Sequence, residues 1–556
     1  MTELLTSAQM RAIEAAAIAS GEVTGLELME RAGRGVVEAI FEEWPELRAT
    51  SHRAVVLCGP GNNGGDGFVV ARLLKEWGWE VEVSLYGDPE RMPPDARVNY
   101  ERWLGMGEVG ALQEGVLNKA VMRAIEHEGV DRIGYPDPKQ GRRTLYIDAL
   151  FGIGLNRPLP SDLMEIVIHE WRDECWANGV AIDIPSGVCS DSGRVLAPPG
   201  SYLYAKLTVT FQAPKIGHYL DLWNYDCPSL RCVDLGLSKF HDDPGQPVWL
   251  NTKLPSVAFD YTGFALNKLQ DGHKYKHGHA LILSGPSGHG GAARLSARGA
   301  LRIGAGVVTV GCPGEAMAEH AARLDAIMLR EVGDGAALSA VLEDRRINAL
   351  CLGPGLGLDA RAEGLVAAAL EGSRGKPRPT GAAHVGRGLP RLVLDADALT
   401  LIARDATLFA ALHEGCVLTP HAGEFARLFP DIAERLAAPA TKGPAYSKVD
   451  ATREAAAGAG CVVLYKGPDT VIADPSGRCS INSAAYERAA PWLATAGSGD
   501  VLAGFIAGLL ARGFDPMQAA ETGAWLHVEC ARSFGPGLIA EDLPEELPKV
   551  FRSLGL

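Results

Sequence analysis

A turn of small residues with one carboxylate runs directly into an apolar helical stretch late in the chain. Residues 494–510 read ATAGSGDVLAGFIAGLL, and the backbone N–H groups of such a turn point into an anion-binding position at the helix N-terminus. Asp500 lies in the first turn, where a carboxylate can take the proton of a hydroxyl group that attacks a phosphoryl group. Taken alone, Asp500 is equally explained as an acid that stabilises the helix dipole.

Other strand ends in the second half carry small or polar groups that suit the same chemistry. YKGPDT at 465–470 supplies Lys466 and Thr470, and GPGLG at 353–357 follows another strand. DADAL at 395–399 and LTPHAGEFARL at 418–428 each end a strand and begin a helix. Because the carboxyl ends of parallel strands meet at one edge of a sheet, we expect these groups to surround Asp500.

A glycine-rich stretch in the first half, CGPGNNGGDGF at 58–68, also follows a strand but carries Asp66. A phosphate-binding loop normally adds a lysine rather than an acid, so we expect its glycines to let the backbone approach a ligand that places no phosphate beside Asp66. Asp66 then accepts hydrogen bonds from ligand hydroxyls or from N–H groups of the loop. Two more strands end in acids, at Asp148 and Asp183. We expect the three ends to form one crevice; the alternative is that Asp148 and Asp183 only cap the following turns.

Alternating strands and helices position these motifs. In the first half we expect strands at AVVLCG, WEVEVSLYG, TLYIDALFG, VAIDIPSG and LTVTF, with a helix at DLMEIVIHEW and a capping box formed by Thr24 and Glu27. In the second half we expect strands at HALILSG, VVTVGC, INALCLGPG, RLVLDADAL, GCVLTP, CVVLYKG and TVIADP. This alternation predicts an α/β fold with two doubly wound domains.

A Pro-rich, aperiodic segment separates the two series. We expect a first domain at 1–238, a linker at 239–264 and a second domain at 265–556. Residues 371–390 look like a flexible basic insertion.

The composition fits an ordinary globular protein and excludes several classes. Of 556 residues, 47% are hydrophobic and 22% charged, and the net charge of −15 argues against nucleic-acid or anionic-membrane partners. The first ten residues lack a basic region, so we expect no secretory signal, and no apolar run is long enough to span a bilayer. Eleven cysteines without a CxxC pair indicate buried thiols in a reducing cytoplasm.

The second-half motifs GPGLG, LDADAL, LTPHAGEFARL, KGPDTVIADP and ATAGSGDVLAG together resemble the NAD(P)H-hydrate dehydratase family over residues 265–535. The resemblance implies a ribokinase-like three-layer domain that uses ADP with magnesium to remove water from hydrated NADH or NADPH. Phosphoryl transfer to the ring hydroxyl, with Asp500 as base, would precede loss of phosphate. The segment before the GSGD motif departs from the family's Thr-Gly-Asn element and reads NSAAYERAAPWLATAGSGD.

The same resemblance assigns residues to the two ligands. The adenine nucleotide would contact Lys466, Gly467, Pro468, Asp469, Thr470 and Gly499. The hydrated nicotinamide would contact Asp500, His421, Ala292 and a glycine of the GPGLG motif, Gly355 or Gly357. His421 is alternatively a helix-capping or core histidine.

The first-half motifs GPGNNGGDG, DALFGIGLNRPL, IDIPSGV and LTVTFQAPKIGH resemble the NAD(P)H-hydrate epimerase family over residues 1–235. The resemblance implies a Rossmann-like three-layer domain that interconverts the R and S hydrates and holds a potassium ion through Asn63, Asp148 and Ser186. One carboxylate with neutral oxygens suits such a weakly hydrated cation. Asp183 would be a catalytic proton shuttle, and Lys215 would neutralise phosphate. The hydrate site would comprise Asn62, Asn63, Gly64, Gly65, Asp66, Gly152, Ile153, Gly154, Leu155, Asn156, Arg157, Pro158 and Asp183.

Together the two resemblances imply a bifunctional enzyme, an isomerase fused to a lyase, in which the epimerase supplies the epimer that the dehydratase accepts. Its partners would be small molecules, and the superfamily suggests a homo-oligomer. Two alternatives stay open: a ribokinase-like kinase of a small alcohol with an accessory domain, and a non-catalytic nucleotide-binding scaffold.

Overall fold

The computed structural model describes residues 1–128, 143–171, 175, 177–196, 198, 200–221, 226–241, 245–252, 254, 266–268, 273–374 and 389–556. The chain forms two compact units. The N-terminal unit comprises Glu3–Pro247 with Ala438–Ser447, and the C-terminal unit comprises Met1–Thr2, Val248–Ala437 and Lys448–Leu556.

The N-terminal unit contains a seven-stranded parallel sheet in the order β4-β3-β2-β5-β6-β7-β8. Its strands are β2 (Arg53–Cys58), β3 (Glu80–Leu85), β4 (Val109–Ala111), β5 (Thr144–Ala149), β6 (Gly179–Ile182), β7 (Leu207–Phe211) and β8 (Ser229–Val233). Its helices are α1 (Ser7–Ala19), α2 (Gly25–Glu43), α3 (Asn62–Glu76), α4 (Pro94–Leu104), α5 (Val116–Glu128) and α6 (Ser161–Glu170). The strand order reverses between β2 and β5, which is where a doubly wound sheet opens a crevice.

Both faces of this sheet are covered, as strands of a parallel sheet require. Along β2, Ala54 and Val56 join one apolar core with residues of α2, α3 and α4, whereas Val55 and Leu57 join a second core with residues of α5 and α6. The predicted capping box is confirmed at α2, where Thr24 Oγ1 accepts from Glu27 N (3.2 Å) and Thr24 N donates to Glu27 Oε2 (2.7 Å).

The C-terminal unit contains a larger sheet, in which its strands follow the order β9-β18-β17-β16-β15-β14-β13-β10-β11-β12. Its strands are β9 (Val248–Leu250), β10 (His279–Leu283), β11 (Val307–Cys312), β12 (Met328–Glu331), β13 (Ala349–Leu352), β14 (Arg391–Leu394), β15 (Cys416–Leu418), β16 (Val462–Tyr465), β17 (Asp469–Ala473) and β18 (Cys479–Ser483). Its helices are α8 (Gly291–Arg302), α9 (Met317–Ala321), α10 (Gly335–Val341), α11 (Ala360–Gly372), α12 (Ala396–Arg404), α13 (Ala406–Ala410), α14 (Ala422–Leu428), α15 (Pro430–Ala437), α16 (Lys448–Ala459), α17 (Ser498–Ala511), α18 (Pro516–Phe534) and α19 (Asp542–Ser553).

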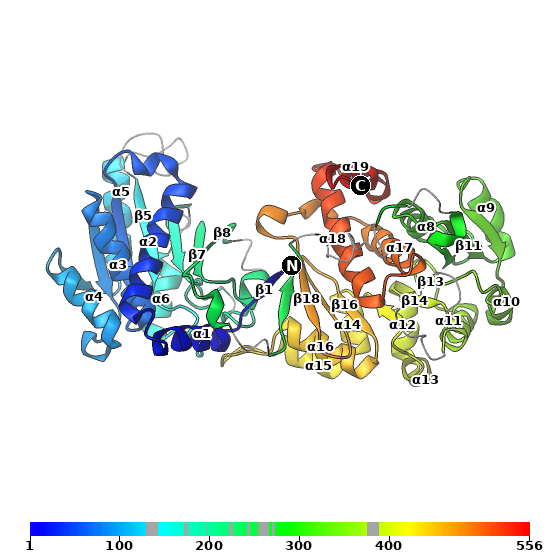
Figure 1. The fold of residues 1–556 in the computed structure, drawn as a ribbon, viewed down its shortest axis with the longest axis horizontal. Coiled ribbons are helices and arrows are strands. Elements are labelled where there is room, and N and C mark those ends of the chain that lie inside the picture. Colours follow the sequence, from blue (N-terminus) through cyan, green and yellow to red (C-terminus); the bar gives the residue numbers. More distant parts are fainter. Residues whose placement is uncertain are drawn as a thin grey trace. The chain divides into compact units, whose positions relative to one another are not determined.

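This unit has the predicted three layers. Helices α8, α17 and α18 cover one face of the sheet, and α11, α12, α14 and α16 cover the other (Figure 1). The strands from β12 to β16 are parallel, whereas β17 pairs antiparallel with both β16 and β18. The antiparallel edge differs from a uniformly parallel sheet, because β16 and β17 are joined by a short turn that leaves no room for a crossover helix.

The segment predicted as a linker contains ordered structure. Residues Val248–Leu250 form β9, which pairs parallel with β18, so an aperiodic sequence can still supply a strand when a sheet edge offers hydrogen-bonding partners. Of the predicted insertion at 371–390, residues 375–388 lie outside the described residues.

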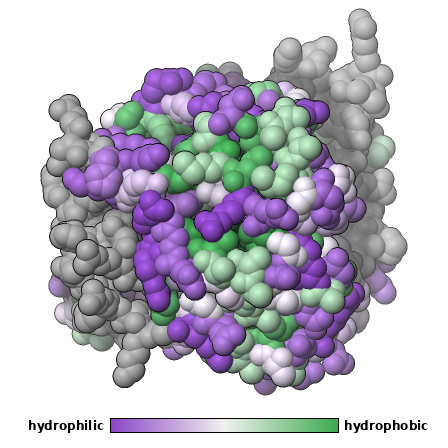
Figure 2. Space-filling model, turned by 90° about the vertical axis from the view of Figure 1, so that its right-hand side faces the viewer, coloured by the Kyte–Doolittle hydropathy of each residue, from purple (hydrophilic) through white to green (hydrophobic). Residues whose placement is uncertain are grey.

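The thiols and the surface agree with the composition. Ten of the eleven cysteines are buried, and Cys232 is exposed. On the face drawn in Figure 2, apolar residues gather between hydrophilic ones, which is common on protein surfaces and identifies no interface by itself. The homo-oligomer stays a prediction. Among the described residues, no helix is both long and apolar enough to cross a membrane.

Candidate active sites

The N-terminus of α17 begins with a turn that requires glycine at Gly497. This residue has a φ of 87°, in the left-handed region, and a Cβ there would lie 2.8 Å from Leu295 Cδ1. The next residues, Ser498 to Asp500, open a helix whose first N–H groups have no helical carbonyl to pair with. The predicted anion-binding turn is therefore formed by backbone donors at the end of a buried helix.

Two side-chain hydrogen bonds tie this turn to groups outside α17. Ser498 Oγ donates to the carbonyl of Leu493 (2.9 Å), and Nε2 of His527 lies 2.9 Å from the carbonyl of Ser498. Burial lowers the pKa of His527 to about 4, so the ring is neutral near pH 7 and donates Nε2–H to that carbonyl. No sequence motif points to His527, which lies 29 residues from Ser498.

Asp500 is a carboxylate whose proton affinity suits a general base. Burial is the largest cause that raises its pKa to about 6, and Asp395, Asp397 and Glu424 add to the effect while Lys466 opposes it. Since a general base works best when its pKa lies near the working pH, the surroundings shift Asp500 in the useful direction.

Lys466 is held beside this turn by an ion pair. Its Nζ lies 2.7 Å from Asp395 Oδ1 and 3.8 Å from Glu424 Oε2, and a Cβ built on Gly499 would lie 3.5 Å from the same nitrogen. Burial by itself would lower the pKa of Lys466, but the carboxylates of Asp395 and Glu424 outweigh burial and raise the pKa. The sequence identified Lys466 but not these two partners, because their pairing depends on β14, β15 and β16 being neighbours.

The turn that follows Lys466 is closed by Thr470 within it and by Lys448 of α16. Thr470 Oγ1 donates to the carbonyl of Gly467 (2.7 Å) and accepts from its N–H (3.3 Å). Lys448 Nζ lies 2.6 Å from Asp469 Oδ1 and 4.4 Å from the centroid of the Tyr465 ring. The backbone of this turn is thus held in one conformation, which is useful for a loop predicted to contact a nucleotide.

The glycine loop after β13 lies against the loop after β10, where the strand order of the larger sheet reverses. Gly355 has a φ of 64°, and a Cβ there would lie 2.5 Å from the carbonyl oxygen of His289 and 3.5 Å from Ala292 Cβ. The N–H of Gly357 donates to Asp397 Oδ2 (2.9 Å). The structure therefore brings together Ala292, Gly355 and Gly357, as expected for three groups at one crevice.

His421 has the capping role that its alternative interpretation anticipated. It is the N-cap of α14, and its Nδ1 accepts from the N–H groups of Gly423 (3.0 Å) and Glu424 (3.4 Å). The side chain is nonetheless 56% exposed, with Nε2 3.4 Å from Glu424 Oε1. Capping fixes the ring while leaving it accessible, so the predicted ligand contact remains compatible with the geometry.

In the N-terminal unit the predicted glycine loop is partly helical. Helix α3 begins at Asn62, so Asn62 to Asp66 form its first turn and the start of its second. A Cβ on Gly64 would lie 1.9 Å from the carbonyl oxygen of Gly59, and one on Gly65 would lie 2.6 Å from Met29 Sδ. These two glycines are required because the helix packs against the protein's own atoms, which differs from the predicted approach to a ligand.

Gly152 sits between two predicted site residues. A Cβ on Gly152 would lie 2.9 Å from Asn63 Oδ1 and 2.9 Å from Asp183 Oδ2. The next residue, Ile153, donates its N–H to Asp183 Oδ2 (3.0 Å). The ends of β2, β5 and β6 therefore meet at Gly152, as the sequence predicted. In the rest of the predicted hydrate loop, Gly154, Asn156 and Arg157 are exposed, and the carbonyl of Asn156 accepts from Gly443 N (2.8 Å).

Asp148 and Ser186 form a fully buried pair. Ser186 donates its hydroxyl to Asp148 Oδ1 (2.7 Å) and its N–H to Oδ2 (2.8 Å), and Leu150 N donates to Oδ1 (3.1 Å). Burial raises the pKa of Asp148 to about 6 despite these hydrogen bonds. A buried carboxylate with neutral donors gains from a nearby cation. Among the described residues, no cluster of three or more His, Cys, Asp or Glu side chains could hold a metal ion.

Asp183 has a strained backbone conformation, and its carboxylate is fixed by several neighbouring groups. Its φ is 70°, unusual for a residue with a side chain, and its Oδ1 accepts from Thr210 Oγ1 (3.0 Å) and lies 3.4 Å from Lys215 Nζ. Burial would raise the pKa of Asp183, but Lys215 and the hydrogen bonds outweigh burial and lower the pKa. His218 Nε2 lies 2.8 Å from the Asp183 carbonyl oxygen.

The prediction that Lys215 neutralises phosphate is wrong. The side chain is fully buried, and its ammonium donates to Thr210 Oγ1 (2.9 Å) and to the carbonyls of Phe211 (2.9 Å) and Ala213 (3.1 Å). Its three N–H donors are therefore engaged within the protein, and its charge lowers the pKa of Asp183.

Two further carboxyl groups surround Asp183. Asp66 has a pKa raised well above its usual range by burial and by the charges of Asp183 and Glu14. The pKa of Glu14 is raised by burial and by Asp183, with Lys215 and Arg11 opposing the effect. Sequence reasoning missed Glu14, because nothing in the pattern of α1 places that helix beside the strand ends.

Each unit thus gathers acids, lysines and glycine turns at the carboxyl ends of parallel strands, which defines a two-domain α/β enzyme with two small-molecule sites. A family model described as NAD(P)H-hydrate dehydratase matches residues 280–549, and one described as YjeF-related protein N-terminus matches residues 25–217. A bifunctional NAD(P)H-hydrate repair enzyme of Moorella thermoacetica is 34% identical over 99% of this chain and 97% of its own length. The chain belongs to the family of bifunctional NAD(P)H-hydrate repair enzymes.

Other relatives match one or both halves. A bifunctional NAD(P)H-hydrate repair enzyme of Coxiella burnetii is 32% identical over 98% of both chains. An NAD(P)H-hydrate epimerase of Roseobacter litoralis is 48% identical over 39% of this chain and 92% of its own length. A solved ADP/ATP-dependent NAD(P)H-hydrate dehydratase from Bacillus subtilis is 25% identical, with a TM-score of 0.42, and the match covers 55% of this chain and 98% of the other.

Proposed function

We propose that the chain repairs hydrated NADH and NADPH in two steps: the N-terminal unit interconverts the R and S hydrates, and the C-terminal unit dehydrates the S form with ADP. The observation that supports dehydration best is Asp500, a carboxylate whose pKa is raised to about 6 mainly by burial. It lies in the first turn of α17, next to Gly499, whose Cβ would meet the Lys466 ammonium at 3.5 Å. A base, backbone donors and a lysine thus share one place, as phosphoryl transfer requires.

In the proposed dehydration, Asp500 takes the proton of the ring hydroxyl. The hydroxyl oxygen then forms a bond to the terminal phosphorus of ADP, and the bond between that phosphorus and the bridging oxygen of ADP breaks. The lone pair of the ring nitrogen then expels the new phosphate group with its bonding electrons. Transfer of a proton from the adjacent ring carbon to water restores the double bond of the reduced nicotinamide. Phosphate leaves far more readily than hydroxide, which explains why a kinase-like site serves a dehydration.

The nucleotide contacts proposed here are Lys466 to Thr470 and Gly499, and the hydrate contacts are Ala292, His421 and the glycines at 355 and 357. Magnesium bound with ADP would neutralise phosphate charge, held mainly through the phosphate oxygens and water. The protein contributes the fixed turn after Lys466, where Thr470 and Lys448 close the backbone around Gly467 and Asp469.

For epimerisation we propose Asp183 as the proton shuttle, with Asn62 to Asp66 and Gly152 to Pro158 around the hydrate. Lys215 and Thr210 keep Asp183 ionised and oriented. Potassium would be held by Asn63, Asp148 and Ser186, where it would balance the buried carboxylate. The donor chemistry fits: Asn63 Nδ2 is buried without a hydrogen-bond partner among the described residues, and an amide flip would place an oxygen at that position.

One assay tests both halves. Both hydrate epimers are supplied with ADP, with ATP or with neither, and the return of reduced cofactor is followed by absorbance. Full conversion of both epimers supports the proposal. Asp500→Ala should stop all conversion, whereas Asp183→Ala should leave only the S form converted rapidly. A stable phosphorylated product without reduced cofactor would instead indicate a small-alcohol kinase, and an Asp500→Asn variant with intact biological activity would indicate a scaffold.

A further inference from the structure

The connection between β18 and α17, residues 484–497, joins the two regions proposed to contact the nucleotide. At its start, Ala484 N donates to the carbonyl of Pro468 (2.7 Å), within the turn that follows Lys466. Near its end, the carbonyl of Leu493 accepts from Ser498 Oγ (2.9 Å), in the turn that opens α17. A displacement of this connection would therefore move both regions.

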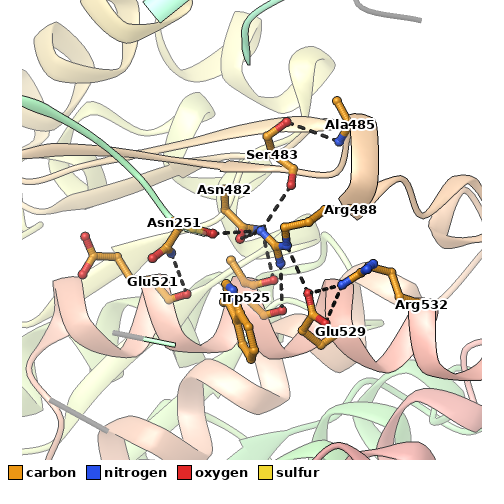
Figure 3. Close-up of polar contacts among 10 residues, drawn as sticks. Asn251, Asn482, Ser483, Ala485, Arg488, Glu521, Trp525, Glu529 and Arg532 are labelled. Carbon is orange, nitrogen blue, oxygen red and sulfur yellow. Dashed lines mark hydrogen bonds and ion pairs between the residues drawn. The ribbon is translucent and has the colours of Figure 1, made fainter. Parts of the chain in front are cut away.

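Arg488 lies in the middle of the connection and pins it to the rest of the unit (Figure 3). Its Nε donates to Glu529 Oε1 (3.0 Å), and its Nη2 donates to the carbonyl of Trp525 (3.4 Å), both on α18. The acceptors of Nη1 are the carbonyls of Asn251 (2.9 Å) and Ser483 (3.2 Å) and Oδ1 of Asn482 (3.2 Å).

The environment of Arg488 makes these hydrogen bonds hard to replace. The side chain is 14% exposed, and that of Glu529 is 17% exposed, so the pair is largely removed from water. Burial lowers the pKa of Arg488, and the Glu529 carboxylate opposes this effect. The guanidinium also lies 5.5 Å from the centroid of the Trp525 ring. A planar fork of five N–H groups can serve acceptors on three elements at once, whereas a lysine ammonium offers three donors from one point.

Helix α18 holds the turn of α17 as well as the connection. On the same helix, between Trp525 and Glu529, His527 Nε2 bonds to the carbonyl of Ser498. The acceptors of Arg488 are anchored to the same helix: Asn482 Nδ2 donates to the carbonyl of Ala524 (3.1 Å), and Asn251 Nδ2 donates to that of Glu521 (3.1 Å). Arg488 is thus the point where the connection is tied to the helix that also fixes the anion-binding turn.

We propose that Arg488 is a positioning residue of the dehydratase site: by tying the connection to α18, it holds the turn after Lys466 and the turn at Ser498 in the relative geometry that binds ADP. The proposal rests on the dehydration proposed above. Because misplacing reacting groups by about 1 Å can cost roughly 100-fold in rate, removal of the guanidinium should affect catalysis although Arg488 itself touches no reacting atom.

The test compares Arg488→Met with the unaltered full-length chain. We expect kcat/KM for dehydration of the S hydrate to fall by roughly 100-fold, with a rise in KM for ADP and no change in the rate of epimerisation. The KM for ADP is the decisive quantity, since a loss of folded protein lowers the apparent kcat without changing KM. Arg488→Lys should restore part of the loss. The matched control is Arg532→Gln, because Arg532 also bonds to Glu529 (2.7 and 3.0 Å) from its own helix.

Three results would overturn the inference. The first is a KM for ADP in Arg488→Met within about twofold of the unaltered chain. The second is an equal rise in Arg532→Gln. If Arg488→Met does not fold, Arg488→Lys is measured in its place. The third result that would overturn the inference is a KM for ADP in Arg488→Lys equal to that of the unaltered chain. If the unaltered chain returns no reduced cofactor, the proposed dehydration fails, but Arg488 is still tested by calorimetric titration with ADP, where equal affinities would refute its role.

Discussion

Replacing Asp395 by asparagine tests how much of the raised pKa of Asp500 comes from a neighbouring charge and how much from burial. Asp395 is almost fully buried and lies 2.7 Å from Lys466 Nζ; among the groups that raise the pKa of Asp500, it ranks second after burial. The substitution keeps the volume but removes the negative charge. It also leaves Lys466 less neutralised, and since Lys466 lowers the pKa of Asp500, both effects have the same sign.

The net displacement of the Asp500 pKa sets the scale of the expected effect. The pKa of Asp500 rises from its usual 3.8 to about 6, which is a displacement of about 2 units and about 3 kcal/mol. Burial, the larger cause, persists in the variant. We therefore expect the acid limb of the pH profile of dehydration in Asp395→Asn to move to lower pH by less than the full 2 units.

The assay is kcat/KM for dehydration of the S hydrate with ADP, measured between about pH 5 and pH 8. ADP also titrates, but identically for every variant, so only differences between variants are interpreted. Asp397→Asn is the matched control. Asp397 ranks below Asp395 among the groups that raise the pKa of Asp500. The acid limb of the pH profile of Asp397→Asn should therefore move to lower pH by less than that of Asp395→Asn. An acid limb in Asp395→Asn that stays in place or moves to higher pH would refute the reasoning.

The remaining predictions concern stability and the N-terminal unit. The pKa of Asp500 in the folded protein, about 6, exceeds its usual 3.8. The contribution of this group to the free energy of unfolding is therefore lost as the pH rises through 6. Asp500→Asn should abolish dehydration, but above pH 6 its Tm should exceed that of the unaltered chain. Measured by calorimetry, this difference in Tm should disappear as the pH is lowered towards about 4. Gly152→Ala places a Cβ 2.9 Å from the carboxylate of Asp183 and should stop conversion of the R hydrate while the S form is converted normally. Potassium should raise Tm relative to choline in the unaltered protein and not in Asp148→Asn; an equal rise in both would contradict the proposed cation site.

The sequence alone determined the α/β class, most strands and the strand ends at which the proposed chemistry is placed. Strand ends such as those at Asp148, Asp183 and Lys466 are marked by short-range patterns: an apolar run, then a polar residue, then a glycine within four residues. Local backbone geometry produces these patterns, and parallel strands necessarily bring their carboxyl ends to one edge. For this reason the predicted residues Asn63 and Asp183 meet at Gly152, and Lys466 lies beside Gly499.

The tertiary structure decided which groups pair. Lys466 bonds to Asp395, 71 residues away, because β14, β15 and β16 are adjacent. Lys215, which sequence reasoning assigned to phosphate, is buried beneath Asp183. His527 and Arg488 tie α18 to the turn at Ser498 and to the connection before it, although neither residue belongs to a recognisable motif. Charge pairing and burial depend on which elements pack together over long sequence separations, and those contacts are set by the assembled core, whereas a motif reflects only its immediate neighbours along the chain.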